Sequence, residues 1–244
     1  MKSTTEDWIN IDCILKHDRI DIWQFPLHAE FNHAEALLDE TEKNRAKRYH
    51  FARHQRRFTV ARAMMRVILA KYLNTNPLSL IFSYEKHGKP RLHHPSEITF
   101  NISHSDDLAL LAVGQTFPLG VDLEFFSARP YEGIAKNLFS IAENQALKEA
   151  TAALKPLVFF KIWTQKEAFI KTCGLGLAYP TQEFTISAYS QKTETVLDPL
   201  NETSWQMSTF MPQIACPGAL CCHTRVHDLR FVSIMDLKDV TKHL

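Results

Sequence analysis

The most constraining feature of this chain is an order of elements that occurs twice. A helical stretch over about 35–73 precedes three strand-like runs, and a second helical stretch over 155–173 precedes three more, at 183–189, 204–210 and 229–235. Apolar residues recur at helical spacing in the first stretch, and short apolar runs favour strands after it. With 244 residues the chain is long enough to bury a core in two units. The order predicts two similar α+β halves, 1–118 and 119–244.

Composition excludes several classes of function. The 28 Lys and Arg nearly balance 27 Asp and Glu, so the overall charge implies no nucleic-acid or membrane partner. No apolar run approaches membrane-spanning length, and the polar, acidic N-terminus does not resemble a signal peptide. The five cysteines form no C-x-x-C pair, which favours reduced thiols and a cytoplasmic protein.

Basic residues are concentrated in the first helical stretch. Between Lys43 and Lys71 there are ten Lys or Arg and no Asp or Glu. Such a run is usually a solvated helix face, but a run without acidic partners also suits binding of phosphate or of an acidic protein. The sequence leaves both interpretations open.

The segment G-V-D-L-E-F-F (120–126) has the pattern of a strand that carries two carboxylates. Residues two apart on a strand point the same way, so Asp122 and Glu124 share one face. Val121, Leu123 and Phe125 take the opposite face. Because like charges this close repel, the pattern predicts a positively charged group between the carboxylates.

The helix predicted over 155–173 is apolar around most of its circumference, which is typical of a buried helix. It nevertheless contains Lys166, Glu167 and Lys171, and buried charges must be paired or lie at a site. A surface ion pair between Glu167 and Lys171 is the alternative. That alternative leaves Lys166, on the other apolar flank, without an explanation.

Asp122, Glu124 and Glu167 therefore form a candidate metal site if they converge. Hard carboxylate oxygens suit Mg²⁺, with Mn²⁺ also possible, and Mg²⁺ usually completes its octahedron with water and phosphate oxygens. Lys166, Lys171 and the basic helix would supply further positive charge for phosphates. The residues thus predict a magnesium-dependent site for a phosphorylated substrate.

Two other segments carry weaker signals. In F-N-I-S-H-S (100–105), Ser103 and His104 are neighbours on a strand and point to opposite faces, so they are not a nucleophile and its base. Ser140 and Glu143 form an S-x-x-E capping box, which leaves both a structural and a site role open for Glu143.

In their order and spacing, four segments resemble the 4′-phosphopantetheinyl transferases of the long, two-halved (Sfp-like) type. These segments are G-K-P-R-L, F-N-I-S-H-S, G-V-D-L-E and W-T-Q-K-E-A-F-I-K, within residues 88–177. The resemblance implies a pseudodimer in which each half is a long helix packed on a small antiparallel sheet, with the site in the cleft between them. It implies transfer of the phosphopantetheine arm of coenzyme A to a serine of a carrier protein, with release of adenosine 3′,5′-bisphosphate.

The resemblance also assigns roles to the acidic residues. Asp122, Glu124 and Glu167 match the metal-binding carboxylates of the family, and Glu167 is a candidate for deprotonating the incoming serine. Lys171 matches a lysine that contacts the phosphates of coenzyme A. Glu143 aligns loosely with a glutamate near the site.

Further residues match positions that bind coenzyme A. Gly88, Lys89 and Pro90 match the loop beside the adenine and the 3′-phosphate. Ser103 and His104 match residues that bind the phosphates. In addition, Arg62 on the basic helix is a candidate contact of the 3′-phosphate. The partners would be coenzyme A and an acyl or peptidyl carrier protein, and a fused pseudodimer is expected to be a monomer.

Two alternatives remain from the residues alone. In a metal-dependent nuclease, Asp122, Glu124 and Lys166 would form the site for a phosphodiester. The near-neutral charge argues against this function. In a non-catalytic module that binds coenzyme A or a carrier, the acidic positions would not need to be filled, whereas here all three are.

Overall fold

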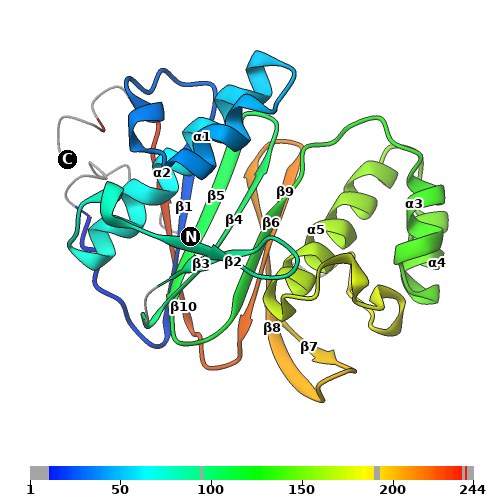
Figure 1. The fold of residues 1–244 in the computed structure, drawn as a ribbon. Coiled ribbons are helices and arrows are strands. Elements are labelled where there is room, and N and C mark those ends of the chain that lie inside the picture. Colours follow the sequence, from blue (N-terminus) through cyan, green and yellow to red (C-terminus); the bar gives the residue numbers. More distant parts are fainter. Residues whose placement is uncertain (1–10, 94–95, 190–192, 238–239, 241–244) are drawn as a thin grey trace.

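The computed structural model describes residues 11–93, 96–189, 193–237 and 240, and Figure 1 shows two α+β parts side by side. The helices are α1 (Glu40–Lys47), α2 (Ala52–Leu73), α3 (Tyr131–Leu138), α4 (Ile141–Glu149) and α5 (Lys155–Cys173). The strands are β1 (Arg19–Pro26), β2 (Phe82–Tyr84), β3 (Pro90–Leu92), β4 (Ile98–Ser105), β5 (Leu108–Gln115), β6 (Leu119–Leu123), β7 (Glu194–Asp198), β8 (Thr203–Gln213), β9 (Cys216–His223) and β10 (Asp228–Ser233). The predicted α+β class with two halves is confirmed.

The N-terminal half is a four-stranded sheet covered by helix α2. Its strand order is β10-β1-β5-β4, with β1 parallel to β10 and antiparallel to β5. Trp23 on β1 packs in one buried cluster with Met64 and Met65 of α2. The helix ends where Asn74 adopts a left-handed conformation with φ 47°, a typical way to terminate a helix. The basic helix predicted from apolar periodicity is therefore an amphipathic helix that buries its apolar face on this sheet.

A short antiparallel hairpin, β2–β3, lies over the N-terminal half. Phe82 pairs with Leu92 and Tyr84 pairs with Pro90. In Figure 1 the hairpin crosses in front of β4 and its turn points toward α5. The predicted G-K-P loop is the end of this hairpin, so a segment of the N-terminal half reaches the C-terminal half.

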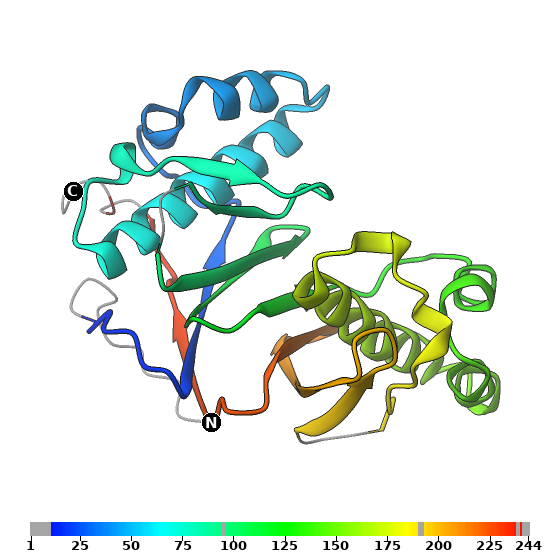
Figure 2. The same cartoon turned by 60° about the horizontal axis from the view of Figure 1, so that its bottom comes forward.

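The C-terminal half is an antiparallel sheet with strand order β6-β9-β8-β7 and helix α5 on one face. A Cβ atom on Gly120 would lie only 2.2 Å from the backbone oxygen of Ala168, so glycine lets α5 lie this close to β6. Gly174 caps α5 in a left-handed conformation with φ 74°. Helices α3 and α4 flank α5 on its outer side (Figure 2).

The two sheets share an apolar layer at their junction. Ile22 and Leu110 of the first sheet belong to one buried cluster with Val121 and Leu220 of the second. Beside this layer, the backbone N–H of Val121 donates to Oδ1 of Asn101 over 2.9 Å, which joins β6 to β4. The junction is thus a packed core, and the ends of β4 and β6 lie together at its edge.

Two expectations from the sequence differ from the structure. Residues 228–233 form β10, which pairs with β1, so the end of the predicted 119–244 half belongs to the first sheet. There Arg230 donates to the buried carboxylate of Asp21 over 2.9 Å, which anchors the returning strand. The run 183–189 contains no strand. The backbone N–H of Ile186 in that run donates to Glu143, which removes it from any sheet ladder.

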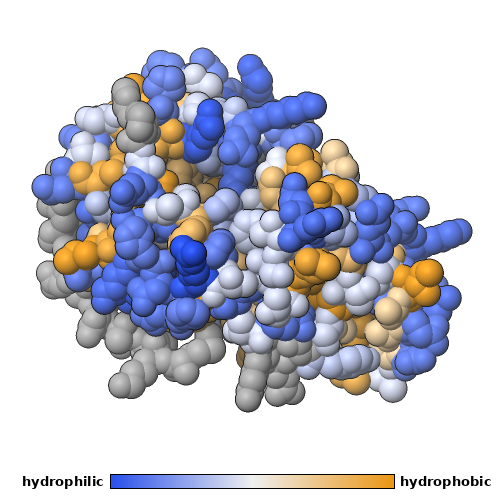
Figure 3. All heavy atoms as spheres, turned by 90° about the horizontal axis from the view of Figure 1, so that it is seen from below, coloured by the Kyte–Doolittle hydropathy of each residue, from blue (hydrophilic) through white to orange (hydrophobic). Residues whose placement is uncertain are grey.

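The surface of the two halves differs in character. Seen from below, the N-terminal half on the left presents mostly hydrophilic side chains, whereas apolar side chains are more frequent on the C-terminal half (Figure 3). Among the residues placed in the structure, no helix is both long enough and apolar enough to cross a membrane.

Candidate active site at the junction of the halves

The centre of the candidate site is the carboxylate of Asp122 on β6, which is 5% exposed. Its Oδ1 atom accepts hydrogen bonds from Ser103 Oγ and from Lys171 Nζ, each over 2.7 Å. Lys171 Nζ also lies 2.8 Å from Ser103 Oγ and 3.2 Å from the backbone oxygen of Val121. Lys171, which arrives from α5, therefore supplies positive charge to one of the two carboxylates of the acidic strand, that of Asp122.

The other oxygen of this carboxylate is unsatisfied. Asp122 Oδ2 is buried and has no hydrogen-bond partner among the residues that the structure describes. A buried carboxylate oxygen without a partner is costly, and such atoms commonly face an ion or a ligand. The observation fits a second cation bound on the side of Asp122 that faces away from Lys171.

Glu124 follows directly after β6 and lies at the edge of the same site. Ser105 Oγ donates to its Oε2 atom over 2.8 Å, and Arg129 lies 3.4 Å from the same oxygen. Burial raises the pKa of Glu124 above its ordinary value, while the hydrogen bond from Ser105 opposes that shift. The negative charge of Asp122 adds to the increase. The two carboxylates therefore act on each other, as the strand pattern indicates.

Glu167 on α5 completes the acidic group. Burial raises its pKa, the charge of Asp122 raises it further, and Lys171 opposes the shift. Within the described ranges, however, no three His, Cys, Asp or Glu side chains are already arranged as a metal-binding cluster. The pKa values of Glu124 and Glu167 are raised mainly by burial, and the negative charge of Asp122 adds to both shifts, so the three carboxylates share one electrostatic environment.

Ser103 and His104 have different surroundings, as their neighbouring places on β4 predict. Ser103 is 7% exposed and bridges Asp122 and Lys171, whereas the side chain of His104 is exposed. Desolvation by nearby protein atoms lowers the pKa of His104, and repulsion from Lys171 and Arg57 lowers it further. The lowered pKa favours the neutral imidazole of His104, which can both donate and accept a hydrogen bond.

The G-K-P loop contacts the C-terminal half through its lysine. Gly88 adopts φ 82°, a conformation that favours glycine, and Pro90 begins β3. Lys89 Nζ donates to the backbone oxygens of Leu119, over 3.0 Å, and of Lys171, over 2.5 Å. The loop therefore lies beside the site, but two donors of Lys89 are engaged by the protein itself.

Arg62 does not point into the site, which corrects its prediction as a phosphate contact. It is 6% exposed and donates to Glu42 over 2.7 Å and to Tyr84 OH over 2.7 Å. Glu42 also accepts a hydrogen bond from Arg66 over 2.7 Å. Two arginines of the stretch without acidic residues thus pair with Glu42, which directly precedes that stretch. Arg62 also holds the hairpin against α1 and α2.

Lys166 is also placed away from the site, and its prediction as a phosphate ligand is corrected. It is 3% exposed, lies 2.9 Å from the Glu143 carboxylate and donates to the backbone oxygens of Thr181 and Phe184. Glu143 completes the predicted capping box with Ser140 and accepts from Ile186. The pair explains why a buried helix carries Lys166, since it joins α5 to α4 and to the segment after η5 (Thr181–Glu183).

The sequence reasoning missed two contacts of Glu124. Ser105 lies two residues after Ser103 on β4, so alternation along the strand could have placed both hydroxyls on one face. Arg129 follows β6 in an irregular segment, and no periodic signal marks it.

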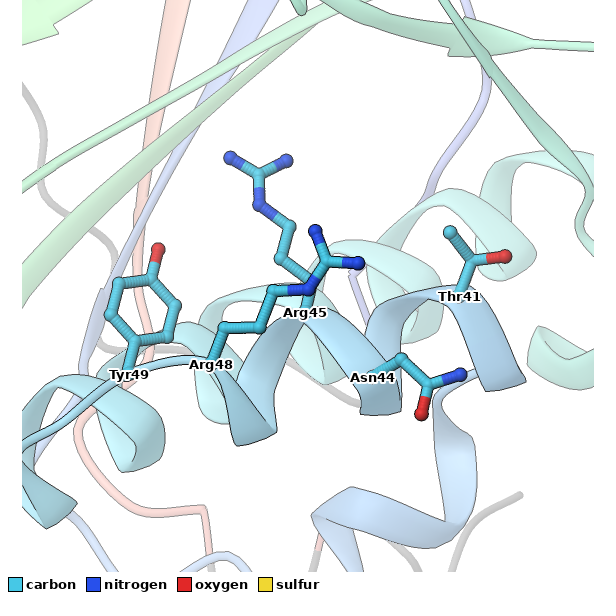
Figure 4. Close-up of a pocket in the computed structure, with 5 residues that line it drawn as sticks. All are labelled: Thr41, Asn44, Arg45, Arg48 and Tyr49. Atoms are coloured by element: carbon cyan, nitrogen blue, oxygen red, sulfur yellow. The ribbon is translucent and has the colours of Figure 1, made fainter.

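A basic pocket on α1 is a second feature that the sequence did not resolve. It has a volume of about 620 Å³ and is lined by Thr41, Asn44, Arg45, Arg48 and Tyr49 (Figure 4). The Arg45 guanidinium lies 5.3 Å from the centre of the Phe58 ring. Other arginines of the basic stretch are paired, as Arg57 is with Asp107 over 2.8 Å. The stretch is therefore partly an internal network and partly an exposed basic surface.

Comparison with known proteins gives consistent matches over both halves. The family model described as "4′-phosphopantetheinyl transferase, N-terminal" matches residues 21–116, and the model described as "4′-phosphopantetheinyl transferase superfamily" matches residues 118–217. The chain is 39% identical over 173 residues to 4′-phosphopantetheinyl transferase HetI of Nostoc sp.. The aligned region covers 67% of this chain and 72% of the relative.

More distant relatives carry the same activity in their names. Identity to 4′-phosphopantetheinyl transferase Sfp of Bacillus subtilis is 24% over 186 residues, or 76% of this chain and 82% of the relative. Identity to L-aminoadipate-semialdehyde dehydrogenase-phosphopantetheinyl transferase of Mus musculus is 28% over 202 residues, or 74% and 65% of the two chains.

Proposed function

Because the chain belongs to the 4′-phosphopantetheinyl transferase superfamily, we propose that the junction around Asp122 is its active site. Enzymes of this family move the phosphopantetheine arm of coenzyme A to carrier proteins, and that is the activity of this chain. The observation that carries the assignment is Asp122, whose Oδ1 meets Lys171 and whose buried Oδ2 has no partner among the described residues. A carboxylate with one satisfied and one unsatisfied oxygen suits a site completed by a bound cation.

The residues that would hold Mg²⁺, or Mn²⁺ in its place, are Asp122, Glu124 and Glu167. When bound, the metal neutralises charge on phosphoryl oxygens, in the manner of metal-assisted phosphoryl transfer. Their oxygen-only donor set favours such hard ions over zinc. The raised pKa values of Glu124 and Glu167 support this role, because a divalent cation would stabilise the ionised carboxylates.

The chain's own residues account for binding and proton transfer. We propose that the pyrophosphate binds beside Asp122, where the charge of Lys171 would orient its oxygens once a hydrogen bond to Ser103, Val121 or Asp122 is exchanged for one to phosphate. We propose that His104 and the loop of Gly88 and Pro90 contact other parts of coenzyme A. Arg62 and Lys166 have no part in the proposal, because their side chains are engaged with Glu42 and Glu143.

The transfer is a nucleophilic displacement at phosphorus, with adenosine 3′,5′-bisphosphate as the leaving group. The oxygen of the carrier serine forms a bond to the phosphorus that adjoins the pantetheine arm. The bond from that phosphorus to the bridging oxygen breaks, and adenosine 3′,5′-bisphosphate leaves with that oxygen. Glu167 is the candidate acceptor of the serine proton, and its raised pKa makes it a stronger base than an ordinary carboxylate.

The structure favours this function over the alternatives. A nuclease site of the type considered would need Lys166 beside Asp122 and Glu124, whereas Lys166 is buried against Glu143. A non-catalytic module would not require three carboxylates with interacting charges. We also infer a cytoplasmic monomer, since all five cysteines are free thiols and one chain supplies both halves of the site.

Calorimetric titration with Mg²⁺ in the presence of coenzyme A tests the metal site. The natural protein should bind the ion, and Asp122→Asn should weaken binding by at least about tenfold. Asp228→Asn, at an exposed position on β10, is the matched control and should bind as the natural protein does. Equal affinity in the Asp122→Asn protein would contradict the assignment.

A further inference from the structure

The turn of the β2–β3 hairpin rests on the C-terminal end of α5. A Cβ atom on Gly174 would lie 3.1 Å from Oε2 of Glu85, and one on Gly176 would lie 3.2 Å from the side chain of His87. Both glycines also adopt positive φ angles, of 74° and 56°. The glycines that end α5 therefore leave room for the hairpin, and a segment of the N-terminal half touches the helix that carries Glu167.

Lys89 makes the polar part of this contact. Its Nζ atom donates to the backbone oxygen of Lys171 over 2.5 Å and to that of Leu119 over 3.0 Å. The oxygen of Lys171 lies in the last turn of α5, where carbonyls lack helical partners and carry the negative end of the helix dipole. The Lys89 ammonium donates a hydrogen bond to a carbonyl that has no donor within the helix. It also holds the end of the helix to the start of β6.

Lys171 is consequently held at two points. Its backbone oxygen is bound by Lys89 from the hairpin, and its ammonium is bound by Ser103 and Asp122. A shift of the last turn of α5 would move the ammonium relative to these groups. Small displacements of a charge that contacts a substrate have large effects on binding and rate.

We propose that Lys89 is a positioning residue, which clamps the last turn of α5 and thereby sets the position of the Lys171 ammonium. This inference rests on the proposed function and replaces the expectation that Lys89 itself binds coenzyme A, in the loop beside the adenine and the 3′-phosphate. A direct ligand would contribute independently of Lys171, whereas a positioning residue acts only through it. The two roles therefore differ in a double-mutant cycle.

The cycle uses coenzyme A affinity, measured by calorimetry in one Mg²⁺ buffer, for Lys89→Met, Lys171→Met and the double variant. Lys89→Met alone should weaken binding by about tenfold. In the Lys171→Met background the same change should weaken it by less than about twofold. Lys86→Met, at an exposed position on the same turn, should bind coenzyme A normally.

Losses that multiply in the double variant would overturn the inference, as would unchanged affinity in Lys89→Met alone. Thermal unfolding checks that each variant is folded. Lys89→Gln keeps an N–H donor without the charge and provides the same cycle if Lys89→Met does not fold. If the natural protein binds no coenzyme A, the proposed function is contradicted. If it binds coenzyme A but the losses of affinity multiply in the double variant, only the role of Lys89 is contradicted.

Discussion

Lys171 Nζ lies 2.7 Å from Asp122 Oδ1, so a lysine of α5 neutralises one side of a buried carboxylate on β6. The same nitrogen lies 2.8 Å from Ser103 Oγ on β4, and one ammonium therefore joins both sheets and the helix. Asp122 Oδ2, on the other side, has no partner within the described residues. The arrangement leaves a place for a second cation, while the three N–H donors of Lys171 are engaged by Ser103, Val121 and Asp122.

Replacing Asp122 should abolish catalysis while the protein remains folded. Asp122→Asn keeps the shape of the side chain but removes its charge, so transfer should fall by about 100-fold or more. Steady-state transfer of the arm to a carrier protein measures the loss, and circular dichroism checks the fold. A variant that turns over normally would show that Asp122 does not act in the reaction.

Glu167→Gln should remove transfer activity but raise the stability of the protein, by an amount that depends on pH. Because the folded pKa of Glu167 is raised, its ionised form destabilises the native protein above that pKa. Without added metal, the Gln variant should melt about 2–4 °C higher at pH 7.5. The difference should shrink as the pH falls through the raised pKa and vanish below about pH 3.5, where the carboxyl is neutral in both states.

Scanning calorimetry at several pH values measures this difference. Transfer activity should be lost in the same variant at every pH, because the candidate base is absent. A Gln variant that melts lower than the natural protein at pH 7.5 would contradict the destabilising role of the ionised carboxylate.

The buried pair of Lys166 and Glu143 should matter for stability. Lys166→Met leaves a carboxylate buried without its partner, so the free energy of unfolding should fall by about 3–5 kcal/mol. Lys155→Met breaks a more exposed pair, with Glu132, and should cost less than about 1 kcal/mol. Urea unfolding compares the two variants, and equal losses would show that burial does not determine the cost.

Two glycines offer a matched test of the packing of α5 on β6. Gly120→Ala would place a Cβ atom 2.2 Å from the oxygen of Ala168 and 2.6 Å from the nitrogen of Thr172, both backbone atoms. It should lower the free energy of unfolding by about 3 kcal/mol or prevent folding. In Gly133→Ala, a Cβ atom in helix α3 meets nothing within 4 Å, and stability should rise by about 0.5–1 kcal/mol. Equal effects of the two changes would argue against close packing at Gly120.

Local patterns predicted much of the fold and the centre of the site. Strand alternation at 120–126 predicts that Asp122 and Glu124 share a face, and the charges on an apolar helix predict a site role for Glu167 and Lys171; in the structure, Lys171 contacts Asp122. These features depend on residues close in sequence. The same reasoning could not identify Lys166 as a structural residue, because its partner Glu143 lies on another helix.

Long-range pairing limited the other predictions. The resemblance makes Arg62 a candidate contact of the 3′-phosphate, but its partner Glu42 lies one residue before the acid-free stretch and is brought near by the turn between α1 and α2. The return of 228–233 to the first sheet likewise depends on β1 offering an unpaired edge, which no local pattern of β10 reveals. Such contacts are set by tertiary packing.

The most direct test of the account is the intact mass of apo carrier proteins of the fatty-acid, polyketide and nonribosomal-peptide types after incubation with this protein, coenzyme A and Mg²⁺. At least one carrier should gain the mass of one phosphopantetheine arm, and EDTA should prevent the gain. If none gains the arm while calorimetry shows that coenzyme A binds, the assignment of a transferase active site around Asp122 is contradicted.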